Sequence, residues 1–405
     1  MKLPKGWEIV SLEKVAKIQT GLAKGKKDQK NVVSLPYLRV ANVQDGYLDL
    51  SEIKEIEVDS SQVNRYLLQN EDILLTEGGD FDKLGRGGIW HCQINPCLHQ
   101  NHVFAVRVNR ENLIPYFFAQ QVSSFYGKAY FLSCAKQTTN LASINSTQLK
   151  KFPVLLPPLL EQCKIVEILG IWDESIDLLE RLIGKTRSRK QGLMQQLLTG
   201  KKRFKEFEGS EWKTVTFEDV LSIEIGGTPS RANAECWDNE KLTSNYWLSI
   251  ADLKYKYINT TKEHITELGA QKSNAKLFPA GTVVMSFKLT IGKVAILSKP
   301  MYTNEAICSL IPKQANSINI EFLYQVIGIV DFDKEIDQAI KGKTLNKEKI
   351  KRLNLKLPPL PEQEKIAAVL SATDEQISTL EKQLAAYKQQ KLGLMQQLLT
   401  GRIRI

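Results

Sequence analysis

Three of the four histidines in this 405-residue chain lie close to two cysteines, and that combination could bind zinc. The residues are His91, Cys92, Cys97, His99 and His102. The cysteines are not spaced as in a zinc knuckle, so we predict no metal site. The six cysteines of the chain are scattered, which indicates reduced thiols and not a disulfide framework.

Catalytic motifs for chemistry on nucleic acids are incomplete. An amino-methyltransferase holds a flipped base with Asn or Asp followed by Pro-Pro and an aromatic residue, but residues 95–98 are Asn-Pro-Cys-Leu. No Gly-x-Gly-x-x-Gly is present, and Asp337 occupies the position of the first glycine of a phosphate-binding loop. No Pro-Asp dipeptide opens a nuclease metal motif. The sequence therefore predicts no catalytic residue.

Polar residues at the ends of expected strands and on glycine-rich loops are the best candidates for DNA contacts. Arg, Asn and Gln can make bidentate hydrogen bonds to guanine or adenine, whereas Lys is better suited to phosphate. For each residue, a solvated surface is the alternative. In the first half of the chain the candidates are Arg39, Asn42, Thr76, Glu77, Gly78, Gly79, Arg86, His99, Gln100, Asn101 and Lys136. In the second half they are Ser249, Asp252, Ser286, Lys288, Lys293, Lys341 and Lys343.

These candidates fall in two stretches that share landmarks. YLRVANV at Tyr37 is similar to YWLSIADL at Tyr246, and HQNHVFAVRV at His99 is similar to TNEAICSLIP at Thr303. Short β-branched runs, Gly and Asp turns and flanking helices indicate α+β domains. We therefore predict two related globular domains that differ in detail.

A long helix follows each domain, and the two helices form a direct repeat. PPLLEQCKIVEIL begins at Pro157 and PPLPEQEKIAAVL begins 201 residues later at Pro358, with 23 identities in 44 ungapped positions. Apolar residues recur at spacings of four and three, as in a coiled-coil seam. About 39 residues make a rod of roughly 58 Å, too long for one domain core. The predicted seam contains Ile165, Leu169, Trp172, Ile176, Leu179, Ile366, Leu370, Thr373, Ile377 and Leu380.

Matching seam registers favour pairing of the two helices over packing of each helix on its own domain. If the segment between them is one compact domain, its ends lie near each other, so the helices should run antiparallel with pseudo-two-fold symmetry. Lys190 and Lys391 occupy matching seam positions, where they either mark the register or extend to solvent. The predicted boundaries are 1–155 and 204–356 for the domains, and 156–203 and 357–405 for the helices.

Composition suggests the class of partner. The chain is 42% hydrophobic and 25% charged, with a net charge of +10. This basic excess favours an anionic partner, although a solvated basic surface would also produce it. No stretch approaches the roughly 18 apolar residues of a membrane helix, and we see no apolar signal core, so we expect a cytoplasmic protein without a membrane partner. Two similar domains on a rod suit two half-sites of double-stranded DNA, and their divergence predicts an asymmetric target.

The repeated PPL-x-EQ-x-KI and LMQQLLTG motifs, with Gly-Trp at Gly6 and Glu-Trp at Glu211, resemble the specificity subunits of type I restriction–modification systems. The resemblance covers essentially the whole chain. It implies two target-recognition domains separated by paired conserved-region helices, and a non-catalytic subunit that recognises DNA. It also implies docking of two methyltransferase subunits and, in the full complex, two restriction–translocation subunits. S-adenosylmethionine, ATP and magnesium would bind to these partners, with no cofactor in this chain.

Three alternatives remain open at this point. The chain could serve a methylation-only or type II-like system as its specificity subunit. It could be a self-sufficient DNA methyltransferase or nuclease. It could also be a coiled-coil scaffold that does not recognise DNA.

Overall fold

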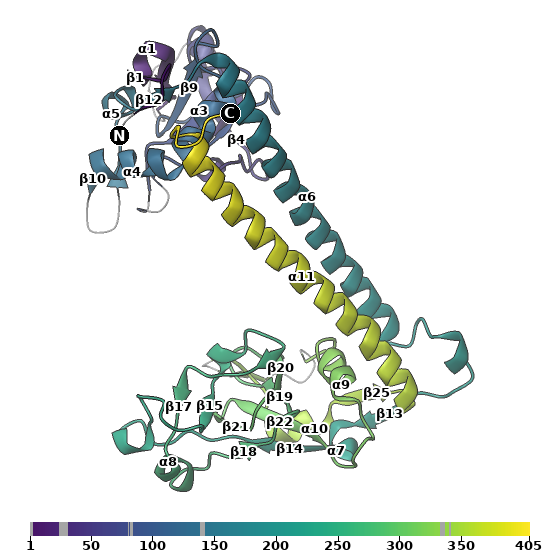
Figure 1. The fold of residues 1–405 in the computed structure, drawn as a ribbon. Coiled ribbons are helices and arrows are strands. Elements are labelled where there is room, and N and C mark those ends of the chain that lie inside the picture. The colour runs from purple at the N-terminus through teal and green to yellow at the C-terminus, as the bar shows by residue number, and fades with distance from the viewer. Residues whose placement is uncertain are drawn as a thin grey trace. The chain divides into compact units, whose positions relative to one another are not determined.

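The computed structural model describes residues 3–23, 31–79, 81, 84–137, 142–332, 337–339 and 342–405, and it divides into two compact units (Figure 1). Unit 1 comprises Met1–Glu180 and Lys382–Ile405, and unit 2 comprises Arg181–Glu381. The two long helices cross this boundary, so each unit contains one globular domain and a segment of each helix. The chain enters unit 2 once and returns to complete unit 1.

The long helices are α6 (Leu159–Leu197) and α11 (Leu360–Leu398), each of 39 residues. Each follows a pair of prolines and has a glutamate in its first turn, where a negative charge suits the helix dipole. Each is followed by a glycine with positive φ, +72° at Gly200 and +68° at Gly401, a conformation that favours glycine. The duplicated start and stop signals explain why the two helices have equal length.

Within unit 1, the first half of α6 pairs with the last part of α11. The rings of Trp172 and Tyr387 meet edge to face, with 5.3 Å between centroids. Asp173 Oδ1 lies 2.6 Å from Lys391 Nζ, and Glu180 Oε1 lies 2.6 Å from Lys388 Nζ. Residue numbers rise along α6 as they fall along α11 in these ion pairs, so the two segments run antiparallel.

Within unit 2, the same arrangement recurs. Lys190 Nζ lies 2.6 Å from Asp374 Oδ1, and Arg187 Nη2 lies 2.5 Å from Glu381 Oε1. The Lys190–Asp374 pair is the Lys391–Asp173 pair of unit 1 displaced by 201 residues. The two seam lysines therefore bind a carboxylate across the helix pair in both units.

The two aspartates also bind the globular domains. In unit 1, Asp173 accepts a hydrogen bond from Gln120 Nε2 at 2.9 Å. In unit 2, Asp374 accepts one from Gln325 Nε2 at 2.8 Å. Each domain is thereby attached to the helix pair through an equivalent glutamine.

The predicted seam residues differ in depth. The first two of each helix are buried and belong to a domain core: Ile165 and Leu169 in unit 1, and Ile366 and Leu370 in unit 2. The other six are half-buried: Trp172, Ile176, Leu179, Thr373, Ile377 and Leu380. The start of each helix thus packs on its own domain, and the half-buried positions continue at helical spacing beyond it.

The globular domain of unit 1 is built on a four-stranded antiparallel sheet of order β2-β9-β5-β7 and a three-stranded sheet of order β4-β3-β8. Two small sheets, β1-β12 and β10-β11-β6, complete it. The strands are β1 (Glu8–Ser11), β2 (Ala16–Thr20), β3 (Val32–Leu38), β4 (Lys54–Asp59), β5 (Ile73–Thr76), β6 (Gly78–Gly79), β7 (Gly87–Ile89), β8 (Leu98–His99), β9 (Val103–Val108), β10 (Lys136–Gln137), β11 (Ala142–Ser143) and β12 (Pro153–Leu156). The helices are α1 (Leu12–Val15), α2 (Val63–Tyr66), α3 (Pro115–Ser123), α4 (Phe125–Cys134) and α5 (Ser146–Lys150), with 3-10 turns η1 (Val40–Asn42) and η2 (Ser60–Gln62).

The globular domain of unit 2 repeats this plan with a five-stranded sheet, β14-β22-β19-β20-β16, and a four-stranded sheet, β17-β15-β21-β18. Sheets β13-β25 and β23-β24 have two strands each. The strands are β13 (Lys213–Thr216), β14 (Leu221–Ile225), β15 (Tyr246–Leu248), β16 (Tyr257–Ile258), β17 (Glu263–His264), β18 (Leu277–Phe278), β19 (Val283–Ser286), β20 (Val294–Leu297), β21 (Met301–Thr303), β22 (Ile307–Pro312), β23 (Asp337–Ala339), β24 (Gly342–Thr344) and β25 (Asn354–Leu357). The helices are α7 (Phe217–Val220), α8 (Glu267–Gln271), α9 (Ile320–Ile327) and α10 (Lys347–Arg352), with 3-10 turns η4 (Lys205–Phe207), η5 (Ala234–Cys236) and η6 (Ile250–Asp252).

Central strands and both long helices share one core in each unit. Every residue of β5 and of β19 is buried, as expected for short apolar strands covered on both faces. The main core of unit 1 includes Met395 and Leu398 of α11, and that of unit 2 includes Leu197 and Leu198 at the end of α6. The predicted α+β fold, with two related domains and a pair of long antiparallel helices, is confirmed.

A buried glutamate at the start of α6 joins three segments of unit 1. Glu161 accepts hydrogen bonds from Trp7 Nε1 at 3.1 Å and from Arg404 Nε and Nη2 at 3.2 and 2.8 Å. The hydrogen bonds from Arg404, the largest cause, hold the pKa of Glu161 below its usual value. The tail after α11 is therefore attached to the start of α6.

The start of α11 carries the same arrangement in unit 2. Glu362 accepts hydrogen bonds from Trp212 Nε1 at 3.0 Å and from Arg203 Nε and Nη2 at 3.0 and 2.6 Å. Its side chain is fully buried, and that of Arg203 is 17% exposed. Each LLTG segment is thus followed by an arginine that binds the first turn of the other long helix.

Among the described residues, no helix combines the length and apolar character needed to cross a membrane.

Candidate nucleic-acid interface

Glu77 lies where three segments of the first domain meet. Its main-chain N–H donates to His102 O at 3.0 Å, and its C=O accepts from Ile144 N–H at 2.8 Å. Its carboxylate lies 2.6 Å from His102 Nδ1, and Asn101 Nδ2 lies 3.2 Å from the other ring nitrogen. The Glu77 and His102 side chains are 32% and 55% exposed. The structure thus brings two predicted residues, Glu77 and Asn101, together at the surface.

Gly78, Gly79 and Lys136 lie in the adjoining three-stranded sheet. Gly78 and Gly79 form β6, which pairs with β11, and Lys136 lies opposite Ser143 on the other side of β11. Lys136 is exposed. This sheet therefore extends the surface around Glu77 with an exposed lysine suited to phosphate.

Arg39 and Asn42 flank the turn η1. Asn42 Oδ1 accepts the N–H of Arg39 at 2.9 Å, and Asn42 Nδ2 donates to the carbonyls of Asp49 and Glu52, each at 2.9 Å. Asn42 is 3% exposed, so its amide is used in closing this turn. Arg39 Nη2 lies 3.4 Å from the carboxylate of Glu52, and the Arg39 side chain is 20% exposed.

Arg86 connects this turn to the end of β5. Its guanidinium donates to Val40 O and to Gln44 Oε1, both at 3.3 Å. Its main-chain carbonyl accepts the N–H of Thr76 at 3.0 Å. Thr76 is fully buried, whereas Arg86 is half-buried. The two groups of predicted residues are therefore neighbours in the first domain.

His99 is the last residue of β8, and Gln100 follows it in the turn before β9. His99 is 1% exposed, with Nδ1 2.8 Å from Val103 O, and burial lowers the pKa of its ring. Gln100 N–H donates to Leu38 O at 2.9 Å. Contact of Thr76 or His99 with a base stays a prediction. Their hydrogen bonds position the exposed residues beside them.

Ser249 and Asp252 close the turn η6 in the second domain. The Asp252 carboxylate accepts the N–H of Ser249 at 2.9 Å, the hydroxyl of Ser249 at 2.6 Å and the N–H of Lys262 at 2.9 Å. Both side chains are half-buried. They occupy the positions that Arg39 and Asn42 occupy in the first domain.

Ser286, Lys288 and Lys293 lie at one end of the β19–β20 hairpin. Ser286 is fully buried, donates its hydroxyl to Thr290 O and accepts the N–H of Lys293 at 3.1 Å. Lys288 is half-buried beside the Phe287 ring, and Lys293 is exposed. Ser286 thus closes the loop that presents two lysines. Lys341 lies outside the described residues, and the main chain of Lys343 pairs with Gln338 in β24.

The two domains hold these segments with equivalent main-chain hydrogen bonds. Phe287 N–H donates to Ala306 O at 3.0 Å, as Glu77 N–H donates to His102 O. Leu345 N–H donates to Phe287 O at 3.0 Å, as Ile144 N–H donates to Glu77 O. Asn304 N–H donates to Leu248 O at 3.0 Å, as Gln100 N–H donates to Leu38 O.

A glycine is required at one point of this shared framework. A Cβ on Gly21 would lie 2.1 Å from His99 O, and a Cβ on Gly226 would lie 2.0 Å from Thr303 O. Any side chain would force these segments apart. The main-chain framework is thus shared by the two domains, but the side chains on it differ. The differing pairs are Arg39 and Ser249, Asn42 and Asp252, Glu77 and Phe287, and His102 and Ala306.

The family model described as the type I restriction modification DNA specificity domain matches residues 4–185 and, a second time, residues 209–387. The chain belongs to this family. The two matches each contain one globular domain, so both domains are specificity domains.

Two curated relatives are type I restriction enzyme specificity subunits. The MjaVIII protein of Methanocaldococcus jannaschii, a type I restriction enzyme specificity subunit, is 23% identical over 433 residues that cover 100% of this chain and 95% of the relative. The EcoKI specificity subunit of Escherichia coli K12 is 26% identical over 215 residues, covering 52% of this chain and 44% of the relative.

Among solved structures, a chain from a study of complex assembly and conformational transition of the type I R-M system has a TM-score of 0.65 and 18% identity, with 100% of both chains covered. The S subunit of a type I restriction–modification system from M. genitalium has a TM-score of 0.56 and 13% identity, with 98% of both chains covered. These similarities show that the specificity-domain fold is shared.

Sequence reasoning missed Arg231 of the second specificity domain. Its Cζ lies 3.7 Å from the ring centroid of Trp237 and 5.0 Å from that of Trp247, and its guanidinium lies 2.5 and 3.0 Å from the two oxygens of Glu263. The hydrogen bonds that Arg231 donates to Glu263 are the largest cause that raises the pKa of Arg231. The side chain is 54% exposed. The available signal was an arginine six residues before a tryptophan in a polar segment.

The histidine–cysteine stretch of the first specificity domain is dispersed in the fold. Cys97 is buried, and burial raises its pKa to about 12, whereas Cys92 is exposed. In the part of the chain that the structure describes, no group of three or more His, Cys, Asp or Glu side chains could hold a metal ion. His99 and His102 contribute hydrogen bonds to the framework and to the surface. His102 was not among the predicted DNA contacts, although the HQNH pattern contains it.

Proposed function

We propose that this chain is the DNA-specificity subunit of a type I restriction–modification complex and that it recognises an asymmetric two-part site in double-stranded DNA. Membership of the specificity-domain family supports the recognition role. The observation that carries the two-part site is the shared main-chain framework with different side chains at equivalent positions. Two domains with the same main-chain framework but different side-chain donors and acceptors suit two half-sites that differ in sequence.

The repeated parts of the chain support two like partners. The 44-residue repeat and the equivalent ion pairs of Asp173 and Asp374 place similar helix surfaces in both units. Identical subunits need equivalent docking surfaces, whereas different half-sites need different side chains. We infer that two methyltransferase subunits dock on the helix pair, that the pair sets the spacer, and that two restriction–translocation subunits join the full complex.

In this proposal, the partner subunits catalyse methylation and cleavage. The sequence lacks a complete methyltransferase motif, and Asp337 replaces the first glycine of a phosphate-binding loop. S-adenosylmethionine, ATP and magnesium would therefore bind to partner subunits. A cytoplasmic location is compatible with this role.

The test is to map methylated positions in DNA incubated with this chain, its methyltransferase partner and S-adenosylmethionine. We expect one motif with two unlike halves and a fixed spacer, and no methylation by either protein alone. Methyl transfer by the chain alone would make it a self-sufficient enzyme. A partner-bound chain that enriches no motif would be a scaffold, and a palindromic motif would contradict unlike half-sites.

A single substitution can assign one half-site to one domain. Arg231→Ala removes a positioned, partly exposed guanidinium from the second domain, so relaxed specificity is expected in one half-site only. Glu240→Ala, an exposed change nearby in the same loop, is the matched control. If Arg231→Ala altered both half-sites equally, the assignment of one half-site per domain would be wrong.

A further inference from the structure

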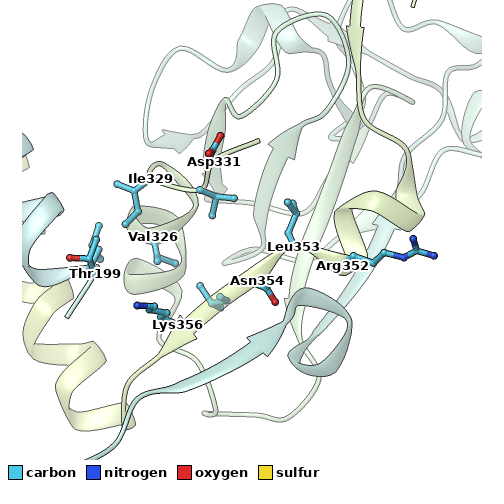
Figure 2. A pocket seen from close by; sticks show the side chains of 11 residues that line it. Thr199, Val326, Ile329, Asp331, Arg352, Leu353, Asn354 and Lys356 are labelled. Carbon is cyan, nitrogen blue, oxygen red and sulfur yellow. The ribbon is translucent and has the colours of Figure 1, made fainter. Parts of the chain in front are cut away.

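A pocket of about 320 Å³ opens beside β25 in unit 2. Figure 2 shows Val326 and Ile329 on one side of it and the side chains of β25 on another. Its lining comes from the two residues after α6, from α9 and the segment after it, from the end of α10, and from β25 and the residue before it. The lining residues are Leu198, Thr199, Val326, Ile329, Val330, Asp331, Arg352, Leu353, Asn354, Leu355 and Lys356.

One edge of β25 has free backbone groups. Among the strands that the structure describes, β25 pairs only with β13 in a two-stranded sheet, with Thr214 opposite Lys356. Phe217 N–H donates to Leu353 O at 2.8 Å, and hydrogen-bonded pairs alternate along an antiparallel ladder. Asn354 and Lys356 therefore direct their N–H and C=O groups away from β13. Within the described residues, no hydrogen bond engages these four groups.

The equivalent edge in unit 1 is closed. Leu155 N–H donates to Gln121 Oε1 at 3.2 Å, and Gln121 Nε2 donates to Leu155 O at 2.9 Å. Two residues earlier, Pro153 has no N–H, and its carbonyl accepts the hydroxyl of Tyr126 at 2.7 Å. Unit 1 therefore satisfies with its own side chains the edge that unit 2 leaves open.

At Lys356, the equivalent of Leu155, the difference follows from one pair of residues. Gln120 of α3 and Gln325 of α9 make the same hydrogen bond to the helix-pair aspartates, so Gln121 corresponds to Val326. Valine has no amide to satisfy β25. It leaves an apolar surface in the pocket beside two unpaired peptide groups.

We propose that an extended segment of one methyltransferase subunit docks on β25 as an additional strand and places an apolar side chain in this pocket. The inference rests on the proposed function, and it adds a contact that only unit 2 can make. The outward N–H and C=O groups of Asn354 and Lys356 are two residues apart, the spacing at which an added strand forms hydrogen bonds. The adjoining pocket would select the side chain that the added strand places there. Two identical methyltransferase subunits would consequently bind this chain unequally.

Position and charge favour this occupant. Leu198 and Thr199 of the pocket belong to the LLTG segment that ends the repeat directly after α6, so the pocket continues the duplicated surface proposed to bind methyltransferase. Arg352 and Lys356 are exposed beside it, and they favour a segment that also carries acidic residues. The edge-strand geometry requires that segment to be extended, not helical.

Hydrogen–deuterium exchange with residue-level resolution tests the proposal on the full chain. In the free chain, the Lys356 amide should exchange at least about tenfold faster than the Leu155 amide. Leu155 N–H donates to Gln121 Oε1, whereas no acceptor within the described residues meets Lys356 N–H. Addition of the methyltransferase should protect Asn354 and Lys356 and leave Leu155 unchanged. Binding without protection of β25 would overturn this proposal and leave the proposed function intact. Absence of any binding would overturn both.

Two substitutions copied from unit 1 should close the edge. Val326→Gln supplies the amide that Gln121 supplies, and Asn354→Pro removes one N–H as Pro153 does. Each should weaken binding of one methyltransferase copy by about tenfold and leave the second copy unaffected. Leu289→Gln, on an exposed loop of the same domain, is the control. If both variants fold but bind both copies as the parent chain does, strand addition is excluded.

Discussion

The two equivalent glutamates, Glu161 and Glu362, should contribute unequally to stability. Replacing Glu362 with alanine removes the acceptor for Trp212 Nε1 and for two nitrogens of Arg203, whose side chain is only 17% exposed. Replacing Glu161 removes the same set of bonds, but the side chain of Arg404 is 48% exposed and can be hydrated. The loss in the free energy of unfolding should therefore be larger for Glu362, whose arginine partner is more buried.

For Glu362→Ala, the free energy of unfolding of unit 2 should fall by about 3–5 kcal/mol, because the change leaves the largely buried Arg203 charge without a carboxylate and the Trp212 indole N–H without its acceptor. For Glu161→Ala, the free energy of unfolding of unit 1 should fall by roughly 1–3 kcal/mol, dominated by the unpaired Trp7 N–H. The expected difference is about 2 kcal/mol.

Urea unfolding followed by pulse hydrogen exchange and mass spectrometry measures the two units separately. Glu364→Ala and Glu167→Ala, which change exposed residues of α11 and α6, are the matched controls and should be neutral within about 0.5 kcal/mol. Equal losses for the two variants, or a larger loss for Glu161→Ala, would refute the reasoning from burial.

The Glu161 contribution should also depend on pH. Its folded-state pKa is lowered from 4.5, chiefly by the hydrogen bonds from Arg404, so its unfolded pKa is the higher of the two. The stabilisation is therefore fully present above about pH 4.5 and is lost as the pH falls through the folded pKa. Glu161→Ala should flatten the dependence of unit 1 stability on pH in that acid range.

Other predictions concern the helix pair and the domains. A double-mutant cycle with Lys190→Ala and Asp374→Asn should give a coupling energy of about 1 kcal/mol by urea unfolding, and a value near zero would exclude a role in register. Trp172→Ala should destabilise unit 1 by about 2 kcal/mol in the same assay, whereas Tyr387→Phe, which keeps the ring, should be nearly neutral. Replacing residues 1–155 with the first domain of another specificity subunit should change one half of the methylated motif only. One extra heptad in each helix should change the spacer and preserve both halves.

The long helices could be predicted from sequence because their signals are local. The proline pair, the first-turn glutamate, the seam spacing and the terminal glycine all lie within one contiguous segment of each copy. The antiparallel direction followed from chain connectivity and needed no knowledge of contacts. The ion pairs of Lys190 and Lys391 could not be assigned, because their aspartates lie more than 180 residues away in sequence.

The candidate site was less predictable because the same residue types serve recognition and folding. Asn42 and Asp252 close turns, and Ser286 closes a hairpin loop, so their polar atoms bind the protein's own backbone. A sequence pattern does not separate these roles, since the partners of these side chains are N–H and C=O groups of the main chain. Arg231 was missed because its position depends on Glu263, which is 32 residues away.

The division of the chain into units has a consequence for synthesis. Unit 2 is one continuous stretch, so its core can assemble while later residues are still being added at the ribosome. Unit 1 receives Met395, Leu398 and the Arg404–Glu161 contact only after nearly the whole chain has been made. The first domain to leave the ribosome is therefore the last to be completed, and a prematurely terminated chain would carry an unfinished first domain that proteases can remove.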